Sequence, residues 1–567
     1  MRDDGLSWLI RISAPAPGVH TRRATLRLAN SGGFELRCAE TGSAVSVLLR
    51  GHADRTLITV TYFAAGRIHP SVAALSNAAV AAWTTAGLHR MLELVSGALP
   101  SIVVNSEDTP VRRGIRVAEQ VVSTGVVRSL RPIRVLKQIG GLAKWGFNLA
   151  GGYAAAAAYT PRRIAVVDDR GTRTFREIHE HSRALAGAMA SLGLGPGDAV
   201  GLLARNHAET VEIMVAAGKL GVDVVLLHAG LSARTIEDVV RRYRLTTLFV
   251  DRELEPLVRY PHAGIPRYLT DPGAPGRVTT AGLIALGRKT FRKPAHAGGL
   301  IVLTSGAGAA PQGARRPHPK GFSTVAALLS RIPLCMNETM LIPAPLFHSW
   351  GLAALQLSTA LRATVVLARH FDAEDCLRRI AEHRATSLIV VPAMLQSILD
   401  LPLAVRARYD TTSLRAVASC GAPLAATTVL RFMDAFGDIL YSTYGSTEVP
   451  WATIAAPEDL RAAPATAGRP PLGTAVAVLG PDRRPVPIGA IGRIHISNHS
   501  LFEDYADSPP DEAGGLLDTG DLGYLDASGL LFLSGRDNTM ITVDSDDVFA
   551  RPAPALKPLA DRAETGR

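Results

Sequence analysis

The feature that most constrains the fold is an alternation of short apolar runs with longer amphipathic stretches, which begins near Arg163. The runs are continuously apolar, and helix-prone segments separate them. Continuous runs are typical of strands buried on both faces, which occur in parallel sheets covered by helices. We therefore predict an α/β fold with strands at residues 164–167, 199–204, 222–228, 246–250, 300–303, 340–342, 364–367, 387–391 and 414–417.

Helix signals lie between these runs. Thr174 and Glu177 have the spacing of a capping box, which predicts a helix over residues 175–192. Beyond Gly473 the β-prone runs become shorter and closer together, which predicts a small β-rich subdomain with strands at residues 475–479, 491–496 and 530–533.

Length, charge and cysteine content exclude several classes of protein. A chain of 567 residues is too long for one hydrophobic core, and 47% hydrophobic with 20% charged residues is a globular composition. The net charge is +11, but the basic residues are scattered without an aromatic stripe, so we predict no nucleic-acid partner. The four cysteines have no metal-binding spacing and fit a reducing cytoplasm.

Residues 1–110 form an unassigned N-terminal extension. Arg2 is followed at once by Asp3 and Asp4 and by too short an apolar run, so no secretory signal is predicted. Two interpretations stay open: an extra small domain, or upstream sequence translated from a misplaced start codon.

Residues 111–160 form a basic amphipathic lead-in. Within it, apolar and basic residues alternate over residues 126–145 and Trp145 lies at the edge. This composition is typical of a helix on a membrane surface, which would give a cytoplasmic protein peripheral membrane contact. The alternative is a helix that docks on the main domain with its basic face in water.

A glycine-rich loop follows the apolar run at residues 300–303. Small residues allow backbone N–H groups to approach an anion, and a strand followed by such a loop is typical of phosphate binding. The candidates for this role are Thr304, Ser305, Gly306, Gly308 and Gly313.

Four further motifs follow the loop in a fixed order. They are Pro345-Leu346-Phe347-His348-Ser349-Trp350-Gly351, Tyr444-Gly445-Ser446-Thr447-Glu448, Asp518-Thr519-Gly520-Asp521 and Gly535-Arg536-Asp537. With the loop, this series resembles the adenylate-forming (AMP-binding) superfamily, and within it the fatty-acid–CoA ligases of lipid metabolism. The resemblance covers residues 126–549. It implies a large N-terminal domain with two parallel-type sheets and a small β-rich subdomain, and a reaction of a carboxylic acid with ATP, Mg²⁺ and CoA.

The resemblance also implies roles for particular residues. Thr447 would bond the phosphate, and Glu448 would hold Mg²⁺. His348 would gate the carboxylate and acyl pocket, although a histidine beside aromatic residues is also common in a core. The nucleotide would contact Gly421, Ala422, Pro423, Tyr444, Gly445, Ser446, Asp521 and Arg536.

Two of these assignments can be made more specific. Asp521 suits the two ribose hydroxyls, but its motif is also a good turn sequence. The acyl pocket would draw on Trp350, residues 391–394 and residues 419–421.

The sequence departs from the family pattern in two places. Relatives usually read Thr-Ser-Gly-Thr-Thr-Gly-x-Pro-Lys-Gly in the loop, whereas residues 304–313 lack two hydroxyls, one glycine and the lysine. After the hinge motif, relatives carry a mobile C-terminal domain with a catalytic lysine, and we expect that domain to be missing here.

These observations predict an AMP-binding α/β body at residues 161–470, a β-rich subdomain at 471–535, and a hinge remnant with a disordered tail at 536–567. Two functions remain open. One is an acyl-CoA synthetase of impaired activity, and the other is a non-catalytic remnant that binds nucleotide or acyl ligand.

Overall fold

The computed structural model describes residues 140–259, 264–273, 276–287, 290–304, 312–315, 323–446, 449–498, 512–513 and 516–536, together with the backbone of six strands between residues 7 and 105. The chain divides into two compact units, each of which combines separate stretches of sequence. Unit 1 comprises residues 1–119, 469–499 and 511–537, and unit 2 comprises residues 120–468, 500–510 and 538–567.

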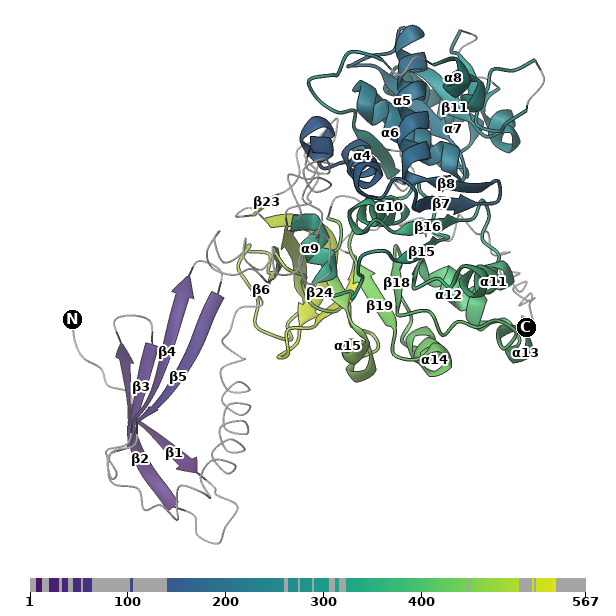
Figure 1. Cartoon of the computed structure of the whole chain (residues 1–567). Helices are drawn as coiled ribbons and strands as arrows, with labels where there is room; N and C mark the ends of the chain where they lie inside the picture. The colour runs from purple at the N-terminus through teal and green to yellow at the C-terminus, as the bar shows by residue number, and fades with distance from the viewer. Residues whose placement is uncertain are drawn as a thin grey trace, which may run out of the picture. The chain divides into compact units, whose positions relative to one another are not determined.

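Unit 2 contains a six-stranded sheet in the order β12-β11-β9-β10-β13-β14, of which Figure 1 labels β11. The first five strands are parallel, and β14 pairs antiparallel with β13 at the edge. The strands are β9 (Ala199–Leu203), β10 (Asp223–Leu226), β11 (Leu245–Val250), β12 (Arg267–Leu269), β13 (Leu300–Thr304) and β14 (Gln312–Arg315).

A second, eight-stranded sheet of unit 2 has the order β20-β19-β18-β17-β15-β16-β7-β8. Its six inner strands are parallel, and the two edge strands are antiparallel to their neighbours. They are β7 (Ile164–Asp168), β8 (Gly171–Thr174), β15 (Thr339–Ile342), β16 (Thr364–Leu367), β17 (Ser387–Val390), β18 (Ala416–Cys420), β19 (Leu440–Tyr444) and β20 (Thr453–Ala455).

Helices connect the parallel strands, as crossover connections require. In the six-stranded sheet, Ile236, Val239 and Val240 of α7 pack into the core formed by the strands. The helical segments are α4 (Leu149–Tyr159), α5 (Phe175–Ser191), α6 (Ala208–Leu220), α7 (Ala233–Arg242), η1 (Arg252–Val258), α8 (Thr280–Leu286), α9 (Ser323–Leu329), α10 (Ser349–Leu361), α11 (Ala373–His383), α12 (Pro392–Leu399), α13 (Leu403–Arg406), α14 (Ala426–Phe436) and α15 (Pro457–Ala462).

Local signals define several of these elements. The predicted capping box is present: the Thr174 hydroxyl accepts from the Glu177 N–H, and the Glu177 carboxylate accepts from the Thr174 N–H. Helix α6 ends at Gly221, whose φ of 82° is readily adopted by glycine. The prediction of parallel sheets covered by helices is confirmed.

Unit 1 holds two antiparallel sheets. The first has the order β1-β2-β3-β4-β5, with bounds Ser7–Ile12, His20–Ala29, Gly33–Cys38, Ala44–His52 and Arg55–Phe63. The second has the order β23-β24-β22-β21-β6, with β25 beside β24, and its strands are β6 (Ile102–Asn105), β21 (Thr474–Leu479), β22 (Gly492–Ser497), β23 (Glu512–Ala513), β24 (Leu516–Leu525) and β25 (Leu531–Arg536).

The structure differs from the sequence predictions in three places. The strand expected at residues 414–417 is Ala416–Cys420, because Leu414 belongs to a turn in which its N–H donates to the Thr411 carbonyl. The Asp518–Asp521 motif lies within β24 rather than in a simple turn, although Gly520 has a φ of 72°. Strand β6 comes from the N-terminal extension and pairs with β21 of the small sheet.

Most of the basic lead-in falls outside the described residues. Residues 140–160 of it are described, and within the amphipathic stretch at 126–145 the described residues are 140–145, which are helical. Among the residues that are described, no helix is long and apolar enough to cross a membrane.

Candidate functional site

The carboxyl ends of the strands in the two unit 2 sheets approach each other along a line that we call the seam. Residues that directly follow β9, β10, β11 and β12 contact residues that follow β7, β15 and β16. The carboxyl ends of parallel strands are where α/β proteins bind ligands. The two ends of the seam are built differently.

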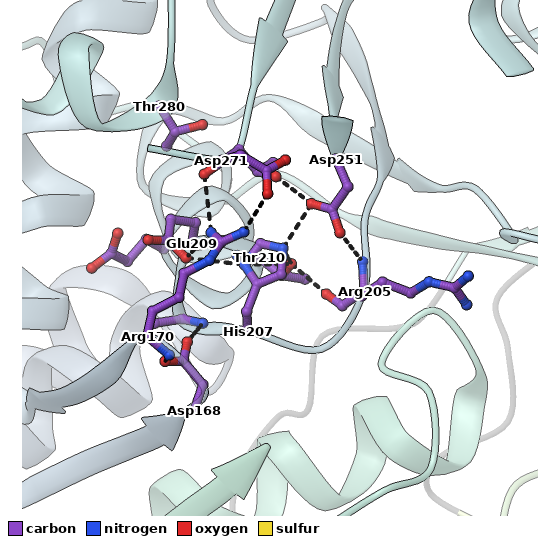
Figure 2. Close-up of polar contacts among 12 residues, drawn as sticks. Asp168, Arg170, Arg205, His207, Glu209, Thr210, Asp251, Asp271 and Thr280 are labelled. Atoms are coloured by element: carbon purple, nitrogen blue, oxygen red, sulfur yellow. Dashed lines mark hydrogen bonds and ion pairs between the residues drawn. The ribbon is translucent and has the colours of Figure 1, made fainter. Parts of the chain in front are cut away.

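One end of the seam is filled by six interlocking charged groups, which we call the clasp: Arg170, His207, Glu209, Asp251, Asp271 and Arg369. Arg170, in the turn between β7 and β8, donates to Glu209 at 2.9 Å and to Asp271 at 2.6 Å (Figure 2). Arg369, after β16, donates to Asp251 at 3.2 Å and to Asp271 at 3.1 Å. Both arginines therefore join the eight-stranded sheet to acids of the six-stranded one.

His207 is the centre of the clasp. Its Nε2 lies 2.8 Å from Asp251 Oδ1 and its Nδ1 lies 3.1 Å from Glu209 Oε2. Burial lowers the pKa of His207, but the hydrogen bonds to the two carboxylates outweigh burial and leave the pKa raised. When the ring is protonated it donates to both acids, and when it is neutral its Nδ1 can accept from the Thr210 N–H, 3.3 Å away at the start of α6.

The two acids respond in the opposite direction. Burial raises the pKa of Glu209, but the hydrogen bond and charge of His207 lower it to about 2. The same opposing effects, with hydrogen bonds from Thr270 and from the Arg205 N–H, leave the pKa of Asp251 far below its usual range. The clasp thus satisfies its own buried charges, and its acids have no need of a ligand.

An uncharged connection occupies the middle of the seam. The buried Asn206 side chain donates to the carbonyls of Ile342 at 3.2 Å and Ala344 at 3.0 Å. Its Oδ1 accepts from the Leu346 N–H at 2.9 Å. One amide therefore holds the segment between β15 and α10, which leads directly to the predicted site residue His348.

The other end of the seam, which we call the open end, carries the predicted site residues of unit 2. His348 lies at the N-cap of α10, Gly421 follows β18, and Tyr444 ends β19. Gly421 has a φ of 105°, a conformation that side chains rarely adopt, so this position requires glycine. Ala422 and Pro423 follow it before α14 begins.

The segment after Tyr444 forms a tight loop. The Ser446 N–H donates to the Val449 carbonyl at 3.0 Å, and the Val449 N–H donates to the Ser446 hydroxyl at 3.1 Å. A Cβ atom on Gly445 would lie 2.6 Å from the Val449 oxygen, so only glycine fits. Thr447 and Glu448 lie between these hydrogen-bonded residues but outside the described ones.

Several buried polar atoms of the open end have no hydrogen-bond partner among the described residues. They are Nε2 of His348, Oγ of Ser419 and Oγ1 of Thr443. Burial, and next the neighbouring His228, lower the pKa of His348 to about 3, so this ring is neutral near pH 7. Buried polar groups normally have a hydrogen-bond partner. Unpaired groups near the carboxyl ends of strands therefore favour a polar ligand at this place.

The predicted phosphate loop is described only at its two ends. Thr304 is the last residue of β13, whereas Ser305, Gly306 and Gly308 lie outside the described residues. Gly313 lies in β14, opposite Leu303, and its N–H donates to the Tyr243 hydroxyl at 2.6 Å. That N–H therefore already has an acceptor within the chain.

The predicted ribose contacts belong to unit 1. Asp521 of β24 and Arg536 of β25 are direct partners in the register of the two antiparallel strands. The Asp521 N–H donates to the Thr519 hydroxyl at 3.2 Å, and the Gly520 N–H donates to Asp518 at 2.8 Å. The fold thus brings together two residues that lie fifteen positions apart in the printed sequence.

The predicted acyl pocket residues lie around α10 and α12. The Trp350 ring is buried, and its Nε1 donates to the Val390 carbonyl at 3.1 Å. Val391 is the N-cap of α12, and Pro392 begins that helix. A cavity beside α10 is lined by Leu142, Phe147, Asn148, Gly152, Ala155, Thr324, Val325, Leu328, Ala353, Gln356, Leu357, Thr359, Ala360 and Trp451.

Metal binding rests on one predicted ligand, Glu448, whose side chain the structure does not describe. No group of three or more His, Cys, Asp or Glu residues suitable for a metal ion occurs in the described part of the chain.

Sequence reasoning missed Asn206, His228 and the clasp. None of them belongs to a motif, and no local pattern marks them. The one available signal was their position directly after predicted parallel strands, where polar residues gather at ligand sites.

Comparison with known proteins identifies the family. A model of the family described as AMP-binding enzyme matches residues 153–506, which is more than half of the chain. A 2-succinylbenzoate–CoA ligase of Bacillus pumilus (strain SAFR-032) is 28% identical over 404 residues, covering 69% of this chain and 79% of the relative. ScoC of Streptomyces coeruleorubidus, a fatty acid–[acyl-carrier-protein] ligase, is 27% identical over 405 residues, covering 69% and 78% of the two chains.

Among solved structures, the amide bond synthetase McbA from Marinactinospora thermotolerans has the same fold, with a TM-score of 0.61 and 24% identity over 69% of this chain and 79% of that one. The family match and the CoA-ligase relatives confirm the resemblance to the AMP-binding superfamily, without singling out the fatty-acid–CoA ligases within it. The chain belongs to the AMP-binding enzyme family, and its relatives include adenylate-forming acid–CoA ligases.

Proposed function

We propose that the chain activates a carboxylic acid with ATP and transfers the acyl group to CoA. In the first step a carboxylate oxygen attacks the α-phosphorus of ATP, the bond to the β-phosphate oxygen breaks, and pyrophosphate leaves. In the second step the CoA sulfur attacks the acyl carbonyl carbon and AMP leaves. Both steps depend mainly on positioning and on charge stabilisation.

The observation that carries this proposal is the unsatisfied open end of the seam. Three buried polar atoms there have no described partner, whereas the acids of the clasp are satisfied by the chain itself. The unpaired atoms occur on or beside residues of the sequence motifs, and all three lie within the stretch that the family model matches. A bound acyl adenylate has phosphate, carbonyl and ribose oxygens that could pair with them.

Each predicted nucleotide contact has its own proposed role. Tyr444 would pack beside adenine, with residues 421–423 lining the slot, and Thr447 would bond the phosphate. Asp521 would accept from the ribose hydroxyls, as a carboxylate suits a vicinal diol, and Arg536 would contact the ribose or phosphate. Thr304 to Gly308 would contribute backbone N–H groups to the phosphates.

Mg²⁺ fits the chemistry of the proposed ligands. Glu448 would supply one carboxylate oxygen and ATP the phosphate oxygens, which are the hard ligands that Mg²⁺ prefers. When bound, the ion would neutralise phosphate charge.

The acid is proposed to be a fatty acid or another acid with an apolar body. The cavity beside α10 is lined by none of the predicted acyl pocket residues, so the support comes from Trp350 and Val391, whose side chains would give that pocket apolar walls. An apolar group placed there would leave water, which favours binding in proportion to the buried area.

ATP–pyrophosphate exchange with a panel of fatty and aryl acids tests the proposal. We expect acid-dependent exchange by the 567-residue chain, and its loss in Glu448→Ala, because that change removes the proposed metal ligand. Glu382→Ala, at an exposed position on α11, is the control and should exchange normally. Exchange that survives Glu448→Ala would refute the metal assignment. If the wild-type chain shows no exchange and an acyl-AMP mimic still raises its Tm, the chain is a binder without turnover.

A further inference from the structure

Three aromatic rings pack together where β10 meets the start of α10. The His228 ring lies edge-on to Phe347, with centroids 4.8 Å apart at 69°. It also lies edge-on to His348, with centroids 5.1 Å apart at 72°. Phe347 and His348 are themselves 4.8 Å apart. His228 thus contacts the residue of the open end whose Nε2 is buried without a described partner.

His228 is itself held by a rigid part of the fold. It lies just after β10, which pairs on one side with β9 and on the other with β13. The preceding Leu227 N–H donates to the Leu202 carbonyl at 2.9 Å, and Nδ1 of His228 accepts from the Gly230 N–H at 2.7 Å. That hydrogen bond fixes both the ring orientation and the tautomer, with the proton of the neutral ring on Nε2.

His348 lacks comparable constraints. It occupies the N-cap of α10, but its side chain makes no capping hydrogen bond. Its imidazole forms no hydrogen bond with any residue that the structure describes, so ring packing is what orients it there. Edge-to-face aromatic contacts have a preferred geometry and can set the plane of a ring.

We propose that His228 is a positioning residue, which orients the His348 ring by edge-to-face packing so that Nε2 of His348 faces an oxygen of the acid substrate. This inference rests on the proposed function, because it assigns His348 to the acid. It adds a residue outside the motifs and assigns it a role through packing rather than through contact with ligand. His228 comes from the six-stranded sheet and His348 from the eight-stranded one, so the role depends on the seam.

The kinetic test compares two substitutions of the same residue. His228→Ala removes the ring, and we expect kcat/KM for the acid to fall on the order of tenfold, the upper range for one aromatic contact, with KM for ATP unchanged. His228→Phe keeps an aromatic edge and should recover most of the loss. His296→Ala, an exposed histidine, is the matched control and should behave as wild type.

NMR of the histidine rings gives a readout that does not need turnover. In His228→Ala we expect the His348 ring resonances to shift and broaden, and in His228→Phe to remain sharp, with Tm values showing that each variant is folded. Unchanged His348 resonances and unchanged kcat/KM in His228→Ala would overturn the inference, as would a His228→Phe variant as impaired as His228→Ala. If the wild type forms no acyl-AMP, the proposed function fails, and the NMR comparison still decides whether His228 orients His348.

Discussion

The two ends of the seam differ in how they satisfy buried polar groups. At the clasp, His207 and two arginines neutralise three acids, with separations of 2.6 to 3.2 Å for the principal contacts. At the open end, His348, Ser419 and Thr443 each leave a buried polar atom without a described partner. Both ends lie at carboxyl ends of parallel strands, so position alone does not make a ligand site. The difference is that the charged groups of the clasp already pair with one another, whereas the three polar atoms of the open end have no described partner.

The clasp also suggests why the open end can remain unsatisfied. Leaving buried polar atoms unpaired costs free energy, which the rest of the fold must offset. The clasp and Asn206 fix the two sheets against each other on the side away from the site. We interpret the clasp as the part of the seam that holds the two sheets together, so that the open end keeps its geometry before a ligand binds.

The largest expected effect is the loss of an acid from the clasp. Asp251→Ala removes a buried acid that pairs with both His207 and Arg369 and leaves each of them one acidic partner fewer, so we expect the free energy of unfolding to fall by about 3–5 kcal/mol. Urea denaturation measures this change.

Asp400→Ala is the matched control. Asp400 pairs with Arg431 at 3.3 Å on the surface, where both side chains are about half exposed, so removing that pair should cost less than about 1 kcal/mol. Equal losses in the two variants would show that the clasp does not hold the seam.

The second prediction concerns pH. The pKa of His207 is raised in the folded chain, so its charge stabilises the fold below the unfolded value of about 6.5, and this contribution is lost as pH rises through the folded pKa. The wild type should therefore lose stability as pH rises above about 6.5, and His207→Gln should lose less.

The acids of the clasp act on the other side of the pH range. Their pKa values are lowered, so their contribution is present above about pH 4 and is lost as pH falls through the folded values. His207→Gln weakens that contribution as well, because the His207 ring lowers the pKa values of both Glu209 and Asp251. Parallel stability profiles for wild type and His207→Gln above about pH 6.5 would contradict a raised pKa of His207.

The smallest effect on stability is expected at the open end. Thr443→Val removes a hydroxyl that has no described partner, so the free energy of unfolding should change by no more than about 0.5 kcal/mol. If that hydroxyl meets the ligand, affinity for an acyl-AMP mimic should fall by about fivefold, which corresponds to roughly 1 kcal/mol.

Thr453→Val on the neighbouring strand β20 is the control. Its hydroxyl donates to the Ala467 carbonyl at 2.6 Å in the buried interior, so its loss should cost about 1–2 kcal/mol without affecting ligand affinity. Thr443→Val that destabilises as much as Thr453→Val would mean that the Thr443 hydroxyl has a partner within the chain.

The sequence was informative wherever a signal is local. Apolar runs predicted parallel strands covered by helices, and the Thr174–Glu177 capping box placed the start of α5 correctly. The motif residues Gly421 and Tyr444 lie at adjacent strand ends, β18 and β19, as a shared site requires. In contrast, the strand predicted at residues 414–417 was displaced, because an apolar residue in a turn extended the run.

Features that depend on distant segments could not be predicted. The six clasp residues come from five stretches of the chain, and only the pairing of strands brings them together. Strand β6 was missed for the same reason. Its four residues are too few to predict a strand by themselves, and they form one because they pair with β21, which lies far away in the sequence. His228 was missed because its role depends on a ring contributed by the other sheet.

Hydrogen–deuterium exchange with and without a non-hydrolysable acyl-AMP mimic tests the difference between the two ends most directly. We predict that the mimic slows exchange at residues 345–351, 417–423 and 441–446, which form the open end, and leaves residues 168–171, 205–210 and 249–253 of the clasp unchanged. Slower exchange confined to the clasp, or no change at either end, would contradict the assignment of the open end as the ligand site.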